Sequence, residues 1–122
     1  MIMVESLKNN LDFQKVYKSG SSYADRYMVM YILENGRDTN RYGISVSKKV
    51  GNSIVRHRLK RIVRESVRLN SDKVRSGYDI VMIVRKALVG CKYDKAEKSF
   101  IHLCSLQGLL FNKEKTGEEG SN

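Results

Sequence analysis

The segment from Ser45 to Arg68 reads SVSKKVGNSIVRHRLKRIVRESVR, and its pattern of apolar and basic residues guides the interpretation of the whole chain. Gly51, Asn52 and Ser53 are typical of a turn followed by a helix start, because Asn and Ser side chains cap free backbone N–H groups. Apolar residues then recur at helical spacing, which predicts an amphipathic helix. Its apolar stripe consists of Val55, Leu59, Ile62, Val63, Val67 and Leu69.

The opposite face of this predicted helix is strongly basic. The segment holds eight of the 23 Lys and Arg residues and a single acid, Glu65, so it carries +7 of the formal net charge of +10. We expect Glu65 to partly neutralise Arg58 or Arg61. Basic residues at 56, 60, 64 and 68 form a same-sign ladder, and like charges four residues apart repel. A solvated helix face is the plain alternative, but such a ladder favours binding to a polyphosphate backbone.

The composition of the 122 residues fits a single domain with one modest core. A sequence pI of about 9.8 favours an acidic partner such as RNA, DNA or an anionic membrane. The chain has no apolar run of about 18 residues and no signal-peptide pattern, so we expect a cytoplasmic protein with no membrane partner. Cys91 and Cys104 lack metal-ligand spacing and are expected to be free thiols.

The rest of the chain shows alternating helical and strand periodicity. The predicted elements are a helix at 10–20, strand at 21–34 with a break near Asp25, a strand at 41–48, a strand at 78–85 and a helix at 94–111. The helix between strands 41–48 and 78–85 predicts that these two strands pair in parallel. Residues 1–8 are expected to form a loose lead-in. The domain spans 1–112, and the polar stretch 113–122 is expected to be disordered.

Two groups of residues are candidates for a binding surface. The strand that precedes the basic helix presents Gly43, Ser45 and Ser47 on one face. A face of Gly and Ser buries little apolar area, so it is either exposed to solvent or a shallow trough for an extended strand. Phe13 and Tyr17 lie one turn apart in the first helix; they either pack in the core or form part of an aromatic platform for unstacked bases.

No catalytic pattern occurs in the chain. A metal-dependent nuclease needs several convergent carboxylates, whereas the thirteen acids are scattered. His57 lies among cations, and His102 has no Ser or Cys placed for activation. Glycine-rich phosphate-binding motifs are also absent from the sequence. We therefore expect no catalytic residue and no metal ligand in this chain, and we assign any chemistry to a partner.

The sequence at 45–65, SVSKKVGNSIVRHRLKRIVRE, closely resembles the signature of the protein subunit of bacterial ribonuclease P, known as the RNR motif. DFQKVYKSG at 12–20 resembles the opening of that family, and YDIVMIVRKA at 78–87 resembles its fourth strand and the following Arg. The resemblance covers about residues 9–111. His57 stands where the family usually has Asn; a neutral imidazole, like an amide, offers both a donor and an acceptor.

The resemblance implies a small single-domain α/β sandwich of order αβββαβα, with a left-handed crossover at the basic helix. It also implies an RNA-binding subunit of ribonuclease P, the endonuclease that removes the 5′ leader of precursor tRNA. Its partners would be ribonuclease P RNA and precursor tRNA, with no protein partner required. The RNA subunit would carry out the hydrolysis with Mg²⁺. The alternative is a ribosomal or general RNA-binding protein with no role in leader cleavage.

The same resemblance assigns roles to individual residues. The residues expected to bind the RNA subunit are Lys48, Lys49, Asn52, Arg56, Arg58, Lys60, Arg61 and Arg64, with Arg68 completing the basic face. The residues expected to bind the leader are Phe13, Tyr17, Arg26, Tyr31, Ser45 and Ser47.

Overall fold

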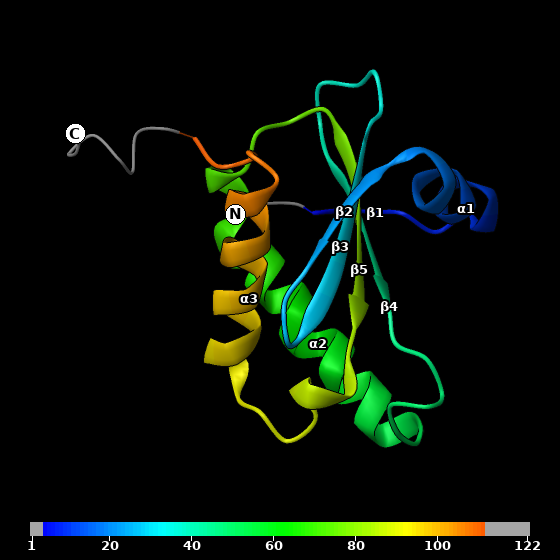
Figure 1. The fold of residues 1–122 in the computed structure, drawn as a ribbon, viewed down its shortest axis with the longest axis vertical. Coiled ribbons are helices and arrows are strands. Elements are labelled where there is room, and N and C mark those ends of the chain that lie inside the picture. Colours follow the sequence, from blue (N-terminus) through cyan, green and yellow to red (C-terminus); the bar gives the residue numbers. More distant parts are fainter. Residues whose placement is uncertain (1–3, 112–122) are drawn as a thin grey trace.

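A computed structural model describes residues 4–111 of the chain (Figure 1). Its elements are β1 (Glu5–Ser6), α1 (Asn10–Ser19), β2 (Ser21–Ala24), β3 (Met28–Glu34), β4 (Arg41–Ser45), α2 (Ser53–Asn70), η1 (Ser71–Lys73), β5 (Tyr78–Val84), η2 (Lys86–Leu88) and α3 (Tyr93–Leu106). The order αβββαβα is confirmed from α1 onward, including the break between β2 and β3. The predicted disordered tail at 113–122 lies outside the described residues.

The strands form one sheet in the order β1-β4-β5-β3-β2. β4 pairs in parallel with β5, with Tyr42 opposite Ile80, as the intervening helix predicts. β3 runs antiparallel to both of its neighbours. α2 makes the crossover between the parallel strands, and the left-handed sense of that crossover is implied by the family resemblance. α2 and α3 cover one face of the sheet, while α1 lies on the other (Figure 1).

The main core lies between the sheet and the pair α2 and α3. α2 contributes Leu59, Val63 and Val67 to it, as the apolar stripe predicts. Leu69 was wrongly placed in that stripe, because its side chain is 48% exposed. The buried edge of α2 instead includes Asn70, whose amide donates to Glu97 of α3 at 2.9 Å. At the end of α2, the polar contact between Asn70 and α3 therefore replaces the apolar contact that the periodicity predicted for Leu69.

The final helix ends earlier than the predicted 94–111. Gly108 has a φ of 73°, a left-handed conformation that glycine adopts without steric penalty. The Leu109 N–H donates to the Cys104 carbonyl at 2.9 Å and the Gly108 N–H to that of Ser105 at 3.0 Å, which closes the helix in a Schellman motif. The turn returns Leu109 to the core, where it is buried.

Part of the expected loose lead-in is ordered. Glu5 and Ser6 form β1, which pairs in parallel with β4. The next N–H, of Leu7, donates to the Tyr42 carbonyl at 2.8 Å, and the Leu7 side chain is buried beside Val16 and Val81. A two-residue strand is too short to show a period, so the single apolar Leu7 was its only sequence signal.

One guanidinium connects the starts of β4 and β5 to α1. Arg41 donates to both carboxylate oxygens of Asp79, at 2.7 and 2.9 Å, and the two side chains are 18% and 8% exposed. It also reaches Asp12, in the first turn of α1, at 3.4 Å. Burial opposes the ionisation of Asp79, but the hydrogen bonds from Arg41 and Asn35 outweigh it and hold the pKa of Asp79 below 3.8.

Replacing Arg41 with Ala should lower the free energy of unfolding at neutral pH by about 3–5 kcal/mol, because it leaves the buried Asp79 carboxylate without its cationic partner. Chemical denaturation measures this change. Arg37→Ala is the matched control: the Arg37–Glu5 pair is 3.5 Å long and 49% exposed on both sides, so its loss should change stability by less than about 1 kcal/mol. Equal effects of the two substitutions would contradict the structural role of Arg41.

The Arg41 contribution should also depend on pH. Because the pKa of folded Asp79 is depressed, the stabilisation is fully present above the ordinary value of 3.8 and is lost as the pH falls through the folded-state pKa. The difference in unfolding free energy between wild type and Arg41→Ala should therefore shrink in acid. A difference that stays constant throughout the acid range would contradict this assignment.

Candidate nucleic-acid interface

The turn before α2 presents two cations and caps the helix. Lys48 and Lys49 are exposed in this turn, which the buried Val50 fixes to the core. The Asn52 carboxamide oxygen accepts from the Val55 N–H at 2.9 Å. Asn52, predicted to bind RNA, is thus also the N-cap of the helix that carries the other cations.

One edge of α2 faces the side of the sheet where α1 lies. Arg56 is half-buried there, and its Nε donates to the Gly51 carbonyl at 3.2 Å. Lys60 and Arg64 follow at one-turn intervals and line a cavity of about 160 Å³ together with Phe13 of α1. This edge therefore brings part of the basic ladder next to Phe13, an aromatic residue that is distant from α2 in the sequence.

The remaining cations of α2 differ in what they contact. Arg61 is exposed, whereas the Arg58 guanidinium donates to the Cys91 carbonyl at 2.9 Å and so contacts the segment before α3. Glu65 pairs with Arg68 at 2.6 and 3.0 Å, and this hydrogen bonding lowers the pKa of Glu65. The expected pairing of Glu65 with Arg58 or Arg61 was wrong, since an acid pairs better with a base that follows it on a helix.

Three aromatic rings form a cluster between α1 and β3, which we call the aromatic cluster: Phe13, Tyr17 and Tyr31. The ring centroids of Phe13 and Tyr17 are 6.3 Å apart, and those of Tyr17 and Tyr31 are 5.2 Å apart. Both pairs meet edge to face, at 61° and 74°. Phe13 and Tyr31 are half-buried and Tyr17 is 37% exposed, so the rings serve both packing and a surface.

Phe13 and Tyr17 of the aromatic cluster border a groove between α1 and β4 with a volume of about 290 Å³, which we call the α1–β4 groove. Its lining residues are Lys8, Asn10, Phe13, Gln14, Tyr17, Ile44, Ser45, Val46 and Lys60. It shares Lys8, Phe13, Ile44 and Lys60 with the 160 Å³ cavity that contains Arg64, so the two hollows adjoin. Aromatic faces and the basic edge of α2 thus meet in one channel.

The structure does not bring every predicted leader residue into this groove. Ser45 lines it, whereas Ser47 lies beyond the end of β4 and is exposed. Arg26 lies in the turn between β2 and β3, with its guanidinium 5.8 Å from the Tyr27 ring. Tyr31 is not among the lining residues of the groove either, and it contacts Tyr17 from β3. The leader-binding roles of all six residues stay predictions.

Three polar residues of the groove were missed at the sequence level. Lys8 belongs to the segment that was expected to be loose, and Asn10 and Gln14 lie on α1. A signal did exist, because Asn9 is the N-cap of α1 and accepts from the Leu11 N–H at 2.8 Å. That cap fixes where α1 begins and hence where these side chains stand.

Comparison with known proteins places the chain in a family. The family model described as Ribonuclease P matches residues 1–106. The chain belongs to the ribonuclease P protein family. The ribonuclease P protein component of Lachnoclostridium phytofermentans is 48% identical over 112 residues, covering 92% of this chain and 97% of the relative. That of Clostridium kluyveri is 47% identical, covering 87% and 96%.

Solved structures of the ribonuclease P family have the same fold. The RNase P protein of Staphylococcus aureus superposes with a TM-score of 0.80 at 33% identity, covering 89% of this chain and all of that one. The RNase P protein of Thermotoga maritima gives a TM-score of 0.77 at 34% identity, covering 84% and 96%. The predicted fold class and family are confirmed.

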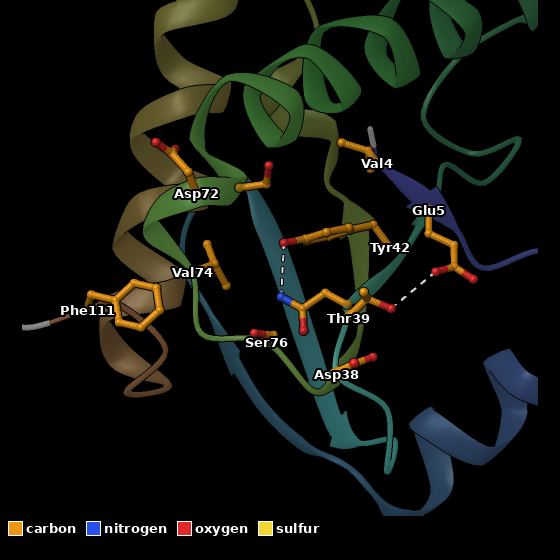
Figure 2. A pocket seen from close by; sticks show the side chains of 11 residues that line it. Val4, Glu5, Asp38, Thr39, Tyr42, Asp72, Val74, Ser76 and Phe111 are labelled. Atoms are coloured by element: carbon orange, nitrogen blue, oxygen red, sulfur yellow. Dashed lines mark hydrogen bonds between the residues drawn. The ribbon is translucent and has the colours of Figure 1, made fainter. Parts of the chain in front are cut away.

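A cavity of about 660 Å³ lies near the starts of β1 and β4 and shares no lining residue with the α1–β4 groove (Figure 2). Glu5, Asp38 and Asp72 line it together with Tyr42 and Phe111, and none of its described lining residues is Lys or Arg. Carboxylates repel a phosphate backbone, so this larger cavity does not fit the RNA partner of a ribonuclease P protein.

Titratable groups outside the interface have structural partners. Asp25 accepts from Ser99 at 2.8 Å and lies 3.3 Å from His102 Nδ1, which ties the β2–β3 turn to α3. The serine hydroxyl donates to the carboxylate and not to the imidazole, so no activated nucleophile results. Both cysteines are free thiols, as predicted, and burial raises the pKa of Cys104 to about 12.

Within residues 4–111, no group of three or more His, Cys, Asp or Glu side chains is placed to hold a metal ion. No helix in that range is both long and apolar enough to cross a membrane.

Glu65→Gln should release Arg68 for contact with phosphate. Each additional phosphate contact steepens the dependence of log affinity on log salt by about 0.7–0.9. We would titrate the variant with ribonuclease P RNA at several salt concentrations. The plot of log affinity against log salt should then be steeper than that of the wild type by the amount expected for one additional phosphate contact. Glu34→Gln, which makes the same charge change at the exposed end of β3, should leave the slope unchanged. Identical slopes for both variants would show that Arg68 does not contact the RNA.

Proposed function

We propose that the chain is the RNA-binding subunit of a ribonuclease P in which the basic side of α2 binds the RNA subunit and the α1–β4 groove holds the 5′ leader of precursor tRNA. The observation that carries this proposal is the position of Lys60. Its side chain borders the groove together with Phe13 and also the adjoining cavity together with Arg64. An RNA strand that extends out of the groove would therefore lie directly beside the cations of α2.

The cations of the turn and α2 suit a surface that docks on folded RNA. Lys48, Lys49, Arg61 and Arg64 are exposed and have no carboxylate partner among the described ion pairs. Such cations release counterions when they neutralise phosphates, which gives affinity without sequence readout. Arg58 and Arg68 make protein contacts, so we give them secondary roles in this docking.

The aromatic cluster suits a single strand whose bases are separated. Because its rings meet edge to face, they do not offer parallel faces to a continuous stack of bases. A base can instead lie on the exposed part of Phe13 or Tyr17 while Lys60 contacts a nearby phosphate. Stacking of this kind is tolerant of sequence, since every base has a π-face. A leader of any sequence is then an acceptable ligand.

Ribonuclease P needs metal ions, and we propose that Mg²⁺ is held mainly by the RNA subunit and the substrate phosphates. The described residues do not form a ligand set for it. The contribution of this chain is to bind and orient the RNA around that centre. We place the protein in the cytoplasm, because two free thiols fit a reducing compartment.

Reversing the charge at Arg64 should weaken assembly with ribonuclease P RNA, since an attractive phosphate contact becomes a repulsive one. Arg75→Glu is the matched control, because Arg75 lies beside the Phe111 ring, lines neither the α1–β4 groove nor the adjoining cavity, and undergoes the same charge change. Filter binding at moderate salt should show at least about a tenfold loss for Arg64→Glu and a much smaller one for Arg75→Glu. Equal losses would mean that only net charge matters.

Phe13→Ala should weaken binding of leader-bearing precursor tRNA by about 1–3 kcal/mol, the usual contribution of one aromatic–base stack. Binding of leaderless tRNA and of ribonuclease P RNA should not change. Leu11→Ala, at a 77% exposed position of the same helix, controls for general effects on α1. Equal loss for leader-bearing and leaderless tRNA would indicate a packing defect and would argue against the groove as the leader site.

A further inference from the structure

We propose that Gly43 determines the depth of the α1–β4 groove, because its lack of a side chain leaves room for the Phe13 ring against β4. We call this contact surface on Gly43 the seat of the ring. Gly43 thereby acts as a positioning residue for the leader. This inference rests on the proposed function of the groove. A Cβ atom at Gly43 would lie 2.5 Å from Phe13 Cζ and 2.9 Å from Cε2. Both distances are shorter than van der Waals contact, so the ring can occupy its observed place only because residue 43 has no side chain.

The backbone of Gly43 gives no other reason for a glycine. Gly43 is not among the described glycines with positive φ, so an L-residue could adopt its conformation. Glycine within a strand weakens the strand and commonly marks a close approach by another group. The approaching group here is the Phe13 ring, and its contact explains the residue at this position.

The seat is part of a row that crosses the sheet. Gly43 on β4 lies opposite Val81 on β5, and Val81 lies opposite Tyr31 on β3. α1 lies over this row: Phe13 contacts Gly43, and Tyr17, one turn later, meets Tyr31 at 5.2 Å. Phe13 and Tyr17, which are four residues apart on one face of α1, therefore contact β4 and β3, the two strands on either side of β5.

A side chain at residue 43 would displace the ring and not the helix. α1 is held by the contact of Asp12 with Arg41 at 3.4 Å and by buried Val16, which packs against Val81. The strand cannot move away, because β4 is hydrogen-bonded between β1 and β5. The Phe13 ring borders both the α1–β4 groove and the adjoining cavity of about 160 Å³, and these two hollows are the open space beside it. A methyl group at residue 43 would therefore push the Phe13 ring into the channel in which we place the leader.

The test is a double-mutant cycle between Gly43→Ala and Phe13→Ala in the reconstituted holoenzyme. Gly43→Ala alone should weaken binding of leader-bearing precursor tRNA by about tenfold, comparable with loss of one stack, and leave leaderless tRNA unaffected. In the Phe13→Ala background it should have no further effect. Ser22→Ala, at an exposed position of strand β2 in the same sheet, is the control, since Ser22 does not line the groove and the substitution adds no atom under the ring. Equal losses in both backgrounds would overturn the inference.

A measurement on the free protein separates this inference from the proposed function. NOEs between the Phe13 ring and the Gly43 α protons should be present in wild type, and the ring should lose its contact with strand β4 in Gly43→Ala. The same substitution should lower the melting temperature in wild type but not in the Phe13→Ala background. An undisplaced ring would overturn the seat. If the ring moves but Phe13→Ala has no leader-specific effect, the seat stands and the proposed leader site fails.

Discussion

The half-buried guanidinium of Arg41 makes the contacts on which the arrangement of the interface depends. It binds Asp79 at the start of the neighbouring parallel strand and Asp12 in the first turn of α1. Without it, nothing polar would hold α1 at that end of the sheet within the described contacts. Because α1 carries Phe13 and Tyr17, the same cation indirectly fixes the aromatic wall of the groove. A single half-buried cation thus connects the stability of the sheet to the geometry of a binding surface.

The sequence of α2 supplies both an apolar face for the core and a basic face for the surface. Leu59, Val63 and Val67 must face the core, which leaves the rest of the helix circumference for cations. Those cations are not equivalent: Arg58 and Arg68 make contacts within the protein, while Lys60 and Arg64 lie beside the groove. The formal charge of the segment therefore overstates the charge that is free for RNA. What distinguishes this face from an ordinary solvated helix is its contact with an aromatic groove.

The sequence predicted those features of the structure that depend on local pattern or on chain connectivity. The periodicity of α2, its Asn52 cap and the parallel pairing of β4 with β5 follow from local pattern and chain connectivity. The roles of Tyr31 and of the aromatic pair on α1 came from the family resemblance. Features that depend on contacts between distant residues were not predictable: strand β1, the exposure of Leu69, and the Gly43 seat. Each of these is set by a partner far away in the chain, which no local period encodes.

The most direct test of the central claim is cleavage of 5′-labelled precursor tRNA at low Mg²⁺ by the protein alone, by a bacterial ribonuclease P RNA alone, and by the two together. The protein is expected to bind both RNAs and to leave the chemistry to the RNA subunit. Product ending at the mature 5′ end should therefore appear only in the mixture. Cleavage by the protein alone, or no rescue of the RNA by folded protein, would contradict this account.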